Sequence, residues 1–178
     1  EAEPMKEFPD TFTVQFTKAQ DLRYGENPHQ RAAFYCENSA GKPALNGLRQ
    51  LHGKELSYNN ILDLSAAFQL SAEFREPAAV IVKHNNPCGC ATSKDGLLAA
   101  YQRAYVCDKT SAFGGIVALN RPVTLDVAET LSKIFLEAVI APGYDAEALT
   151  ALKAKKNLRV MDSSGLSGDK TSSNKGFD

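Results

Sequence analysis

Tryptophan is absent from this chain of 178 residues, which also has only two methionines and four cysteines. Four cysteines in a chain of this length do not make a disulfide framework, so we expect a reducing, cytoplasmic environment. No apolar stretch approaches the roughly 20 residues that a membrane span requires. The first residues also lack the pattern of a signal peptide, and we therefore expect no membrane partner.

A large excess of either charge is missing as well. The formal net charge is -1, so no overall basic field indicates a nucleic-acid partner, although local basic groups can still bind a phosphate. Hydrophobic residues make up 43% of the chain and charged residues 23%, as is ordinary for a globular protein. The length suffices for one domain with a core, or for two small ones.

The two ends of the chain are polar. We expect residues 1–15 to be an N-terminal extension or linker. Residues 162–178 are mostly Ser, Gly, Asp, Lys and Asn, with too little apolar surface to pack, so we expect a flexible tail or a truncated linker. Such ends fit either frayed termini or a segment of a longer polypeptide.

Between these ends, apolar residues recur at strand and helix spacings in turn. The pattern predicts strands at 11–16, 31–36, 78–82, 115–119, 138–141 and 158–161. It predicts helices at 58–74, 95–106, 125–135 and 146–156, with Phe135 facing inward. Ser93 or Asp95, Thr124 and Asp145 are the expected N-caps. Strands that alternate with helices indicate an α/β fold, a layered sheet with helices.

Lys83 and His84 directly follow the apolar run 78–82, and Asn85, Asn86 and Pro87 then predict a turn. Ligands collect outside the carboxyl ends of strands in open α/β sheets. A cation beside an imidazole at such a place is a suitable electrostatic and acid/base pair. A structural role is harder to reconcile with this pair, because burying either group without a partner costs several kcal/mol.

Two further segments hold polar groups of the kinds that bind nucleotides. Arg23 suits bidentate phosphate recognition, and Tyr24 can stack on a base or sugar. A polar surface loop explains the same composition. Asn59 and Asn60 stand at a predicted helix start, where one of them could cap the helix and leave the other for a ligand.

Two of the predicted strands are preceded by residues that could contact a ligand. The segment from Ser111 through Phe113 to Gly114 and Gly115 would let backbone amides approach a ligand closely, although it also fits an ordinary glycine turn. Glu137 stands just before the strand at 138–141. Its carboxylate could bind a ligand hydroxyl or pair with Lys83.

A zinc site needs separate consideration. His84, Cys88, Cys90 and Cys107 are ligand types, but the spacing is Cys-x-Cys rather than Cys-x-x-Cys, and a deaminase also needs a His-x-Glu pattern. We therefore expect no metal, with the cysteines serving as small apolar residues. A relative of the zinc deaminases stays as a further hypothesis.

Five blocks together resemble one family. They are LRYGENPHQ (22–30), LSYNN (56–60), VKHNNPCG (82–89), TSAFGG (110–115) and VIAP (139–142). In this order they resemble the aminoimidazole carboxamide ribonucleotide (AICAR) transformylase domain of the bifunctional purine biosynthesis proteins, which also carry inosine monophosphate (IMP) cyclohydrolase. The resemblance covers residues 16–161 and implies the first transformylase subdomain, with a cytidine deaminase-like fold that lacks zinc.

The resemblance also implies a reaction, in which a formyl group passes from the co-substrate 10-formyltetrahydrofolate to the 5-amino group of AICAR. His84 would be the base, and Lys83 would stabilise the oxyanion or protonate the leaving nitrogen. The other substrate contacts that it implies are Arg23, Tyr24, Asn60, Ser111, Phe113, Gly114 and Glu137.

Parts of the family pattern are missing from the sequence. Neither the cyclohydrolase domain nor the second transformylase subdomain is present, and the family builds its sites across a homodimer. We therefore expect little activity from the chain alone, since positioning supplies much of such a rate. A non-catalytic nucleotide-binding or dimerisation module is the alternative.

Overall fold

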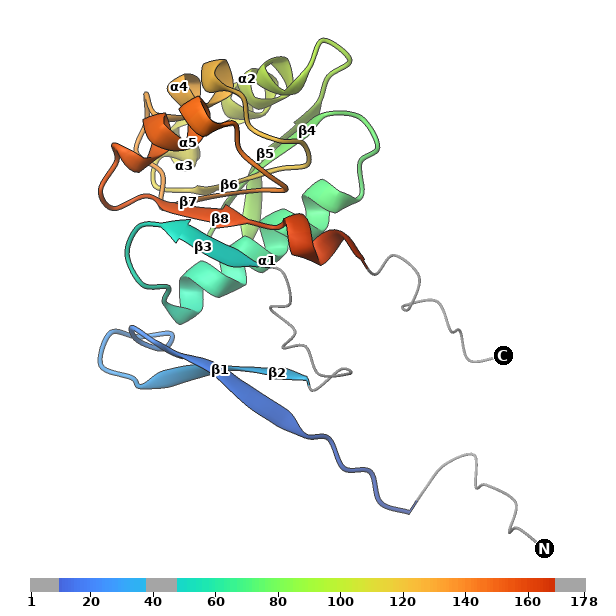
Figure 1. Cartoon of the computed structure of the whole chain (residues 1–178), viewed down its shortest axis with the longest axis vertical. Helices are drawn as coiled ribbons and strands as arrows, with labels where there is room; N and C mark the ends of the chain where they lie inside the picture. Colours follow the sequence, from blue (N-terminus) through green and yellow to red (C-terminus); the bar gives the residue numbers. More distant parts are fainter. Residues whose placement is uncertain (1–9, 38–47, 169–178) are drawn as a thin grey trace, which may run out of the picture.

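A six-stranded sheet with helices on both faces forms the centre of the computed structural model, which describes residues 10–37 and 48–168 (Figure 1). The strand order is β3-β8-β7-β6-β4-β5. These strands are β3 (Arg49–His52), β4 (Ala78–Lys83), β5 (Asn86–Thr92), β6 (Ile116–Leu119), β7 (Ala138–Ala141) and β8 (Arg159–Asp162). A separate antiparallel hairpin consists of β1 (Phe16–Leu22) and β2 (Ala32–Glu37). The α/β layered fold is thus confirmed.

The helices divide unequally between the two faces of the sheet. One face is covered by α1 (Tyr58–Ala72), with the β1–β2 hairpin beyond it (Figure 1). The other face carries α2 (Leu97–Cys107), α3 (Lys109–Ala112), α4 (Leu125–Leu131) and α5 (Ala146–Lys153). A short 3₁₀ helix, η1 (Ser164–Gly168), follows the last strand.

The central strands supply both hydrophobic cores, because successive side chains of a strand point to opposite faces. Ala79 and Ile81 of β4 pack with α2, α4 and α5, whereas Val80 and Val82 pack on the α1 side. Every residue of β6, β7 and β8 is buried. The backbone at the ends of these strands is therefore held firmly in place.

Strand directions decide which chain segments meet at the edges of the sheet. β6, β7 and β8 are parallel to one another, whereas β4 runs antiparallel to β6. The carboxyl end of β4 therefore lies at the edge where β6, β7 and β8 begin. The candidate site thus lies at the carboxyl end of β4, as expected, but at the amino ends of β6, β7 and β8.

The turn after β4 is a tight hairpin rather than an open loop. His84 and Asn85 have φ values of 52° and 62°, and β5 follows at once, antiparallel to β4. Two consecutive residues with positive φ form the hairpin turn that matches the twist of the paired strands. Asn adopts this conformation readily, whereas His does so less often, so the candidate base occupies an uncommon backbone conformation.

Several predicted elements differ from the structure. The prediction of a strand at 11–16 is wrong, since β1 begins at Phe16 and the Phe12 side chain is exposed. Neither β3 nor β5 was predicted. The N-cap of α2 is Gly96 rather than Ser93 or Asp95, while Thr124 and Asp145 do occupy the N-cap positions of α4 and α5.

The folded chain continues beyond residue 161. Asp162 is the last residue of β8, and its carboxylate accepts a hydrogen bond of 2.8 Å from Arg49 on β3. Residues 162–168 therefore differ from the flexible tail that we expected, whereas 1–9 and 169–178 lie outside the described residues. The division into domains stays a prediction.

None of the helices within residues 10–37 and 48–168 combines the length and apolar character needed to cross a membrane.

Candidate active site at one edge of the sheet

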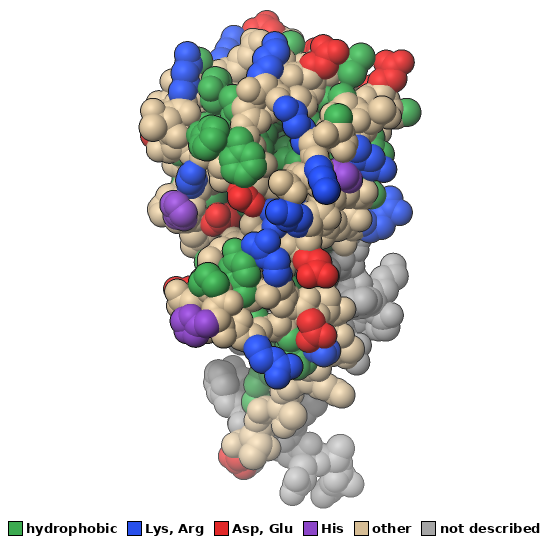
Figure 2. Space-filling model, turned by 90° about the vertical axis from the view of Figure 1, so that its left-hand side faces the viewer, with side chains coloured by type: hydrophobic (Ala, Val, Ile, Leu, Met, Phe, Trp, Pro, Cys, Tyr) green, Lys and Arg blue, Asp and Glu red, His purple; other side chains and the backbone are tan. Residues whose placement is uncertain are grey.

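The ends of four neighbouring strands place functional groups at one edge of the sheet. Lys83 ends β4, Gly114 precedes β6, Glu137 precedes β7, and Arg159 begins β8. The loop between β1 and β2 reaches the same edge, since the N–H of Arg23 donates to the carbonyl of Leu56 just before α1. Figure 2 shows the face that looks onto this edge, where hydrophobic, basic and acidic side chains lie next to one another.

Lys83 is half-buried, and its ammonium group donates a hydrogen bond to the carbonyl of Phe113. An ammonium group has three N–H donors, so two stay available for a substrate. The ammonium also passes close to Gly114, where an added Cβ would lie 3.2 Å from Nζ. Lys83 is thus fixed against the segment that precedes β6.

Gly114 has a φ of 70°, a conformation that favours glycine, and its N–H donates to the carbonyl of Phe135 at 2.8 Å. This bond brings together the rings of Phe113 and Phe135, whose centroids are 5.5 Å apart. The Phe113 ring is 59% exposed and that of Phe135 46% exposed. The two rings offer an open aromatic surface beside Lys83.

Phe135 was predicted to face inward from a helix that ended at 135. That prediction is wrong, because α4 ends at Leu131 and Phe135 lies in the connection to β7. An aromatic residue two positions before the candidate Glu137 was the signal that could have identified it as part of the site.

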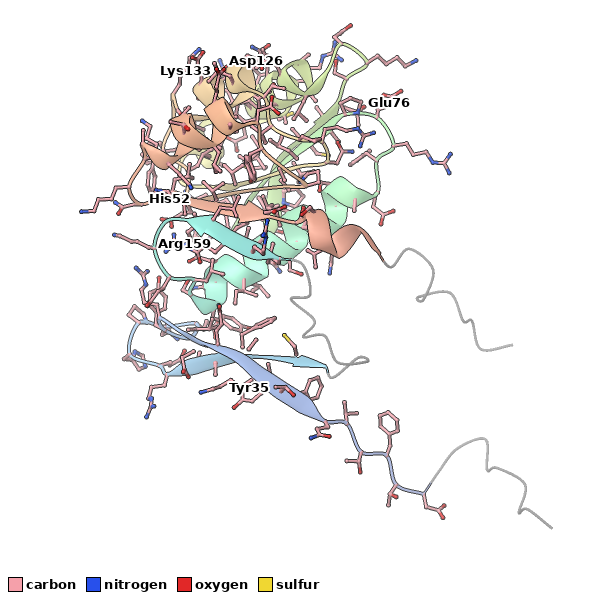
Figure 3. The ribbon with its side chains drawn as sticks, in the orientation of Figure 1. Tyr35, His52, Glu76, Asp126, Lys133 and Arg159 are labelled. Carbon is pink, nitrogen blue, oxygen red and sulfur yellow. The ribbon has the colours of Figure 1, made fainter. Side chains whose placement is uncertain are left out.

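Glu137 pairs with Arg159 rather than with Lys83. The Glu137 carboxylate accepts a hydrogen bond of 2.7 Å from Arg159 Nη1. The Arg159 side chain is only 3% exposed, while that of Glu137 is 40% exposed. Figure 3 shows Arg159 at the end of the sheet near the beginning of α1. The Glu137 carboxylate is therefore held by a buried guanidinium on one side and exposed to solvent on the other.

The Arg23–Tyr24 segment lies against the beginning of α1. Tyr58 N–H donates to the Tyr24 carbonyl at 3.1 Å, and the Arg23 guanidinium donates to the Tyr24 hydroxyl at 3.0 Å. Hydrogen bonds to the Arg23 and Ser57 side chains hold the pKa of Tyr24 below its ordinary value, although burial and Glu137 oppose this shift. Tyr24 and Glu137 are thus close enough to interact electrostatically across the edge.

The His84 side chain is exposed, and its imidazole makes no hydrogen bond or ion pair within residues 10–37 and 48–168. Its backbone is held instead. The side chain of Asn86 donates to the His84 carbonyl at 2.9 Å, and the N–H of Asn85 donates to the Asp63 carboxylate at 2.7 Å. The turn is therefore attached to α1, with the imidazole directed by the backbone alone.

Two predicted contacts are engaged in helix caps. Asn60 is the third residue of α1, and its Oδ1 accepts hydrogen bonds from the N–H and the hydroxyl of Ser57, which is the N-cap. The Ser111 hydroxyl donates to Asp108, the N-cap of α3, at 2.5 Å. Asn59 is not free either, since its amide donates to the Glu26 carbonyl at 3.1 Å. Ligand roles for Asn60 and Ser111 stay predictions.

Within the described ranges, no three His, Cys, Asp or Glu residues come together in a group that could hold a metal ion. Burial raises the pKa of Cys88, and nearby Asp108 raises it further, which disfavours the thiolate that zinc requires. The zinc-deaminase hypothesis therefore lacks a ligand set in this part of the chain.

These features describe an α/β protein with a basic, acidic and aromatic site at one sheet edge. The model of the family described as "AICARFT/IMPCHase bienzyme" matches residues 1–176. The chain therefore belongs to the AICARFT/IMPCHase family.

Relatives with the name bifunctional purine biosynthesis protein PurH include those of Oceanobacillus iheyensis and Bacillus subtilis. The first is 53% identical over 167 residues, which is 94% of this chain and 32% of the relative. The second is 58% identical over 153 residues, 86% of this chain and 30% of the relative. The chain thus spans about a third of the length of the curated relatives that it matches.

Among solved structures, the dCMP deaminase from cyanophage S-TIM5, crystallised with dCMP and dUMP, covers 58% of this chain and 91% of its own. The identity is 16% and the TM-score 0.37. A score of this size does not establish a common fold.

Proposed function

We propose that this chain carries part of a formyl-transfer centre that acts in the biosynthesis of IMP. The substrates would be AICAR and 10-formyltetrahydrofolate. The observation that supports this most is the position of Lys83 and His84 at the edge that also holds Gly114 and Glu137. Binding of a nucleotide and transfer of an acyl group call for a cation, an imidazole, an aromatic surface and an accessible carboxylate. This edge of the sheet offers all four.

The 5-amino group of AICAR is a weak nucleophile, because its lone pair is delocalised. In the proposed step, this nitrogen forms a bond to the formyl carbon, and the bond from that carbon to the folate nitrogen breaks. His84 accepts the proton that the amine loses. Lys83 stabilises the oxyanion with its two remaining N–H donors, or protonates the leaving nitrogen.

The nucleotide would lie between the Arg23–Tyr24 segment and Glu137. Arg23 suits the phosphate, and the open side of the Glu137 carboxylate suits a hydroxyl group. The exposed rings of Phe113 and Phe135 offer a stacking surface for a planar ring. Gly114 leaves space beside Lys83 for the reacting atoms.

The chain is about a third of the length of its relatives, so the proposed site is incomplete by itself. We expect the 178 residues alone to turn over little or no AICAR. A homodimer of the longer protein, in the cytoplasm, would supply the remaining contacts.

Replacement of His84 tests the proposal in a protein that joins this chain to the rest of the relatives' length. His84→Ala should abolish formyl transfer and leave AICAR binding, measured by calorimetry, largely intact. His52→Ala is the matched control, since His52 lies on β3 and its ring contacts the Lys155 carbonyl. Retained turnover in His84→Ala would exclude His84 as the base.

A non-catalytic nucleotide-binding or dimerisation module is the second candidate. It is favoured by the His84 imidazole, which has no orienting partner among the described residues. A general base is ordinarily oriented by a hydrogen bond. Binding of AICAR without any turnover by the longer protein would support this candidate.

A further inference from the structure

The Arg159 guanidinium connects two parts of the proposed site without reaching solvent. Its Nη1 donates to the Glu137 carboxylate at 2.7 Å. Its Nε and Nη2 both donate to the Glu55 carbonyl, at 3.1 and 3.0 Å. With a side chain only 3% exposed, Arg159 has no surface to offer a ligand, so any effect on the site must act through these partners.

Glu55 lies immediately before the segment that holds the Arg23–Tyr24 backbone. The carbonyl of Leu56 accepts the N–H of Arg23 at 3.1 Å, and the first helical residue, Tyr58, donates its N–H to Tyr24. Arg159 therefore holds one side of residues 55–58 while the Arg23–Tyr24 backbone is attached to the other. This chain of contacts links the Glu137 carboxylate to the Tyr24 backbone.

The arrangement leaves room for a role beyond stability. A buried ion pair is often replaceable by apolar side chains at little cost. Here the carboxylate is 40% exposed, so only the cation is buried and the acidic group stays accessible. A planar guanidinium can also bind a carboxylate and a carbonyl at once, which an ammonium group cannot do with the same geometry.

We propose that Arg159 is a positioning residue, which holds Glu137 and the Arg23–Tyr24 segment at the spacing that the nucleotide requires. This inference rests on the proposed function for its ligand, but the contacts themselves can be tested without one. Arg159 would not touch substrate.

The first experiment measures amide hydrogen exchange in the 178-residue chain. Arg159→Met should speed exchange at the N–H groups of Arg23 and Tyr58 about tenfold, since charge-assisted hydrogen bonds are lost. Amides of β4 and β6 should keep their protection. Unchanged exchange at Arg23 and Tyr58 would overturn the inference, as would an equal rise throughout the chain.

Arg49→Met is the matched control. Arg49 also binds a carboxylate at 2.8 Å, that of Asp162, at the other end of the same strand β8. Its replacement should leave the amides of Arg23 and Tyr58 unaffected, and an equal effect in both variants would overturn the inference. If Arg159→Met does not fold, Arg159→Lys keeps the charge and should show the same localised change.

The second experiment measures AICAR binding by calorimetry. Arg159→Met should weaken binding about tenfold and Arg49→Met should not. Equal affinity of Arg159→Met and the unaltered chain would overturn the inference. If the unaltered chain does not bind AICAR, the 178 residues do not form a nucleotide site by themselves. The role of Arg159 is then decided by the exchange experiment.

Discussion

The backbone N–H of Asn85 donates a hydrogen bond of 2.7 Å to the carboxylate of Asp63, which joins the β4–β5 turn to the first turns of α1. This contact spans 22 residues of sequence and fixes the position of the candidate base beside it. The turn has two consecutive residues with positive φ, so an external acceptor helps to hold a conformation that His84 adopts less readily.

Replacement of Asp63 should loosen the turn. Asp63→Ala removes the acceptor, and we expect the Asn85 amide to exchange faster and stability to fall by about 1 kcal/mol. Asp63→Asn retains an acceptor oxygen and is the control. NMR-detected hydrogen exchange measures both, and equal protection of Asn85 in the two variants would show that the contact is unimportant.

A side chain at position 114 should disturb Lys83. Gly114→Ala places a Cβ 3.2 Å from Lys83 Nζ at a φ of 70°. We expect a loss of about 1–2 kcal/mol, the cost of the left-handed conformation, seen as a lower melting temperature.

Gly143→Ala is the control for that substitution. Its added Cβ would meet nothing closer than 3.8 Å, at an ordinary φ. The melting temperature of this variant should change little, and a fall equal to that of Gly114→Ala would refute the explanation from the left-handed conformation.

The rings of Phe113 and Phe135 should stabilise one another. Their centroids are 5.5 Å apart with an interplanar angle of 51°. We expect a coupling energy of about 0.5–1.5 kcal/mol in a double-mutant cycle of alanine variants, measured by urea unfolding. A cycle of Phe135 with the exposed Phe12 should be additive. Additivity in the first cycle would mean that the ring pair contributes no stability.

Acid should weaken the contact between β3 and β8. Burial acts to raise the pKa of Asp162, but Arg49 and the Ser164 amide outweigh it, so the pKa lies below the ordinary 3.8. A depressed pKa means that the stabilisation is present above pH 3.8 and is lost as the pH falls through the folded value.

Asp162→Asn isolates this contribution. The unaltered chain should exceed this variant in stability by about 1 kcal/mol at pH 7, a modest value because the Arg49 side chain is largely exposed. The difference should shrink below pH 3.8. Urea unfolding at several pH values measures it, and a difference that does not change with pH would contradict the assignment.

The sequence predicted the parts of the fold that are buried on both sides. The apolar runs that became β4, β6, β7 and β8 are short and continuous, which indicates strands covered on both faces. β5 escaped prediction because Asn86 and Pro87 disfavour strands. Proline is tolerated there because, among the described residues, β5 pairs with β4 alone at the edge of the sheet.

The sequence pointed to several residues of the candidate site but not to the hydrogen bonds and ion pairs between them. Lys83, His84 and Glu137 stand out because ionisable groups beside apolar runs are unusual. The partner of Glu137 could not be predicted, since pairing depends on which strands are neighbours, and Arg159 at the start of β8 is 22 residues away. The alternation of Phe12 and Val14 led to the wrong prediction of a half-buried strand, because both side chains are exposed.

The reversed direction of β4 has a consequence for distance. Had β4 run parallel to β6, Lys83 would emerge at the opposite edge, near Asn120. Four strand residues span about 13 Å, which is beyond the reach of a lysine side chain. The antiparallel direction of β4 relative to β6 is therefore what brings the lysine within reach of the groups before β6 and β7. Chain polarity contributes to the site as much as residue identity does.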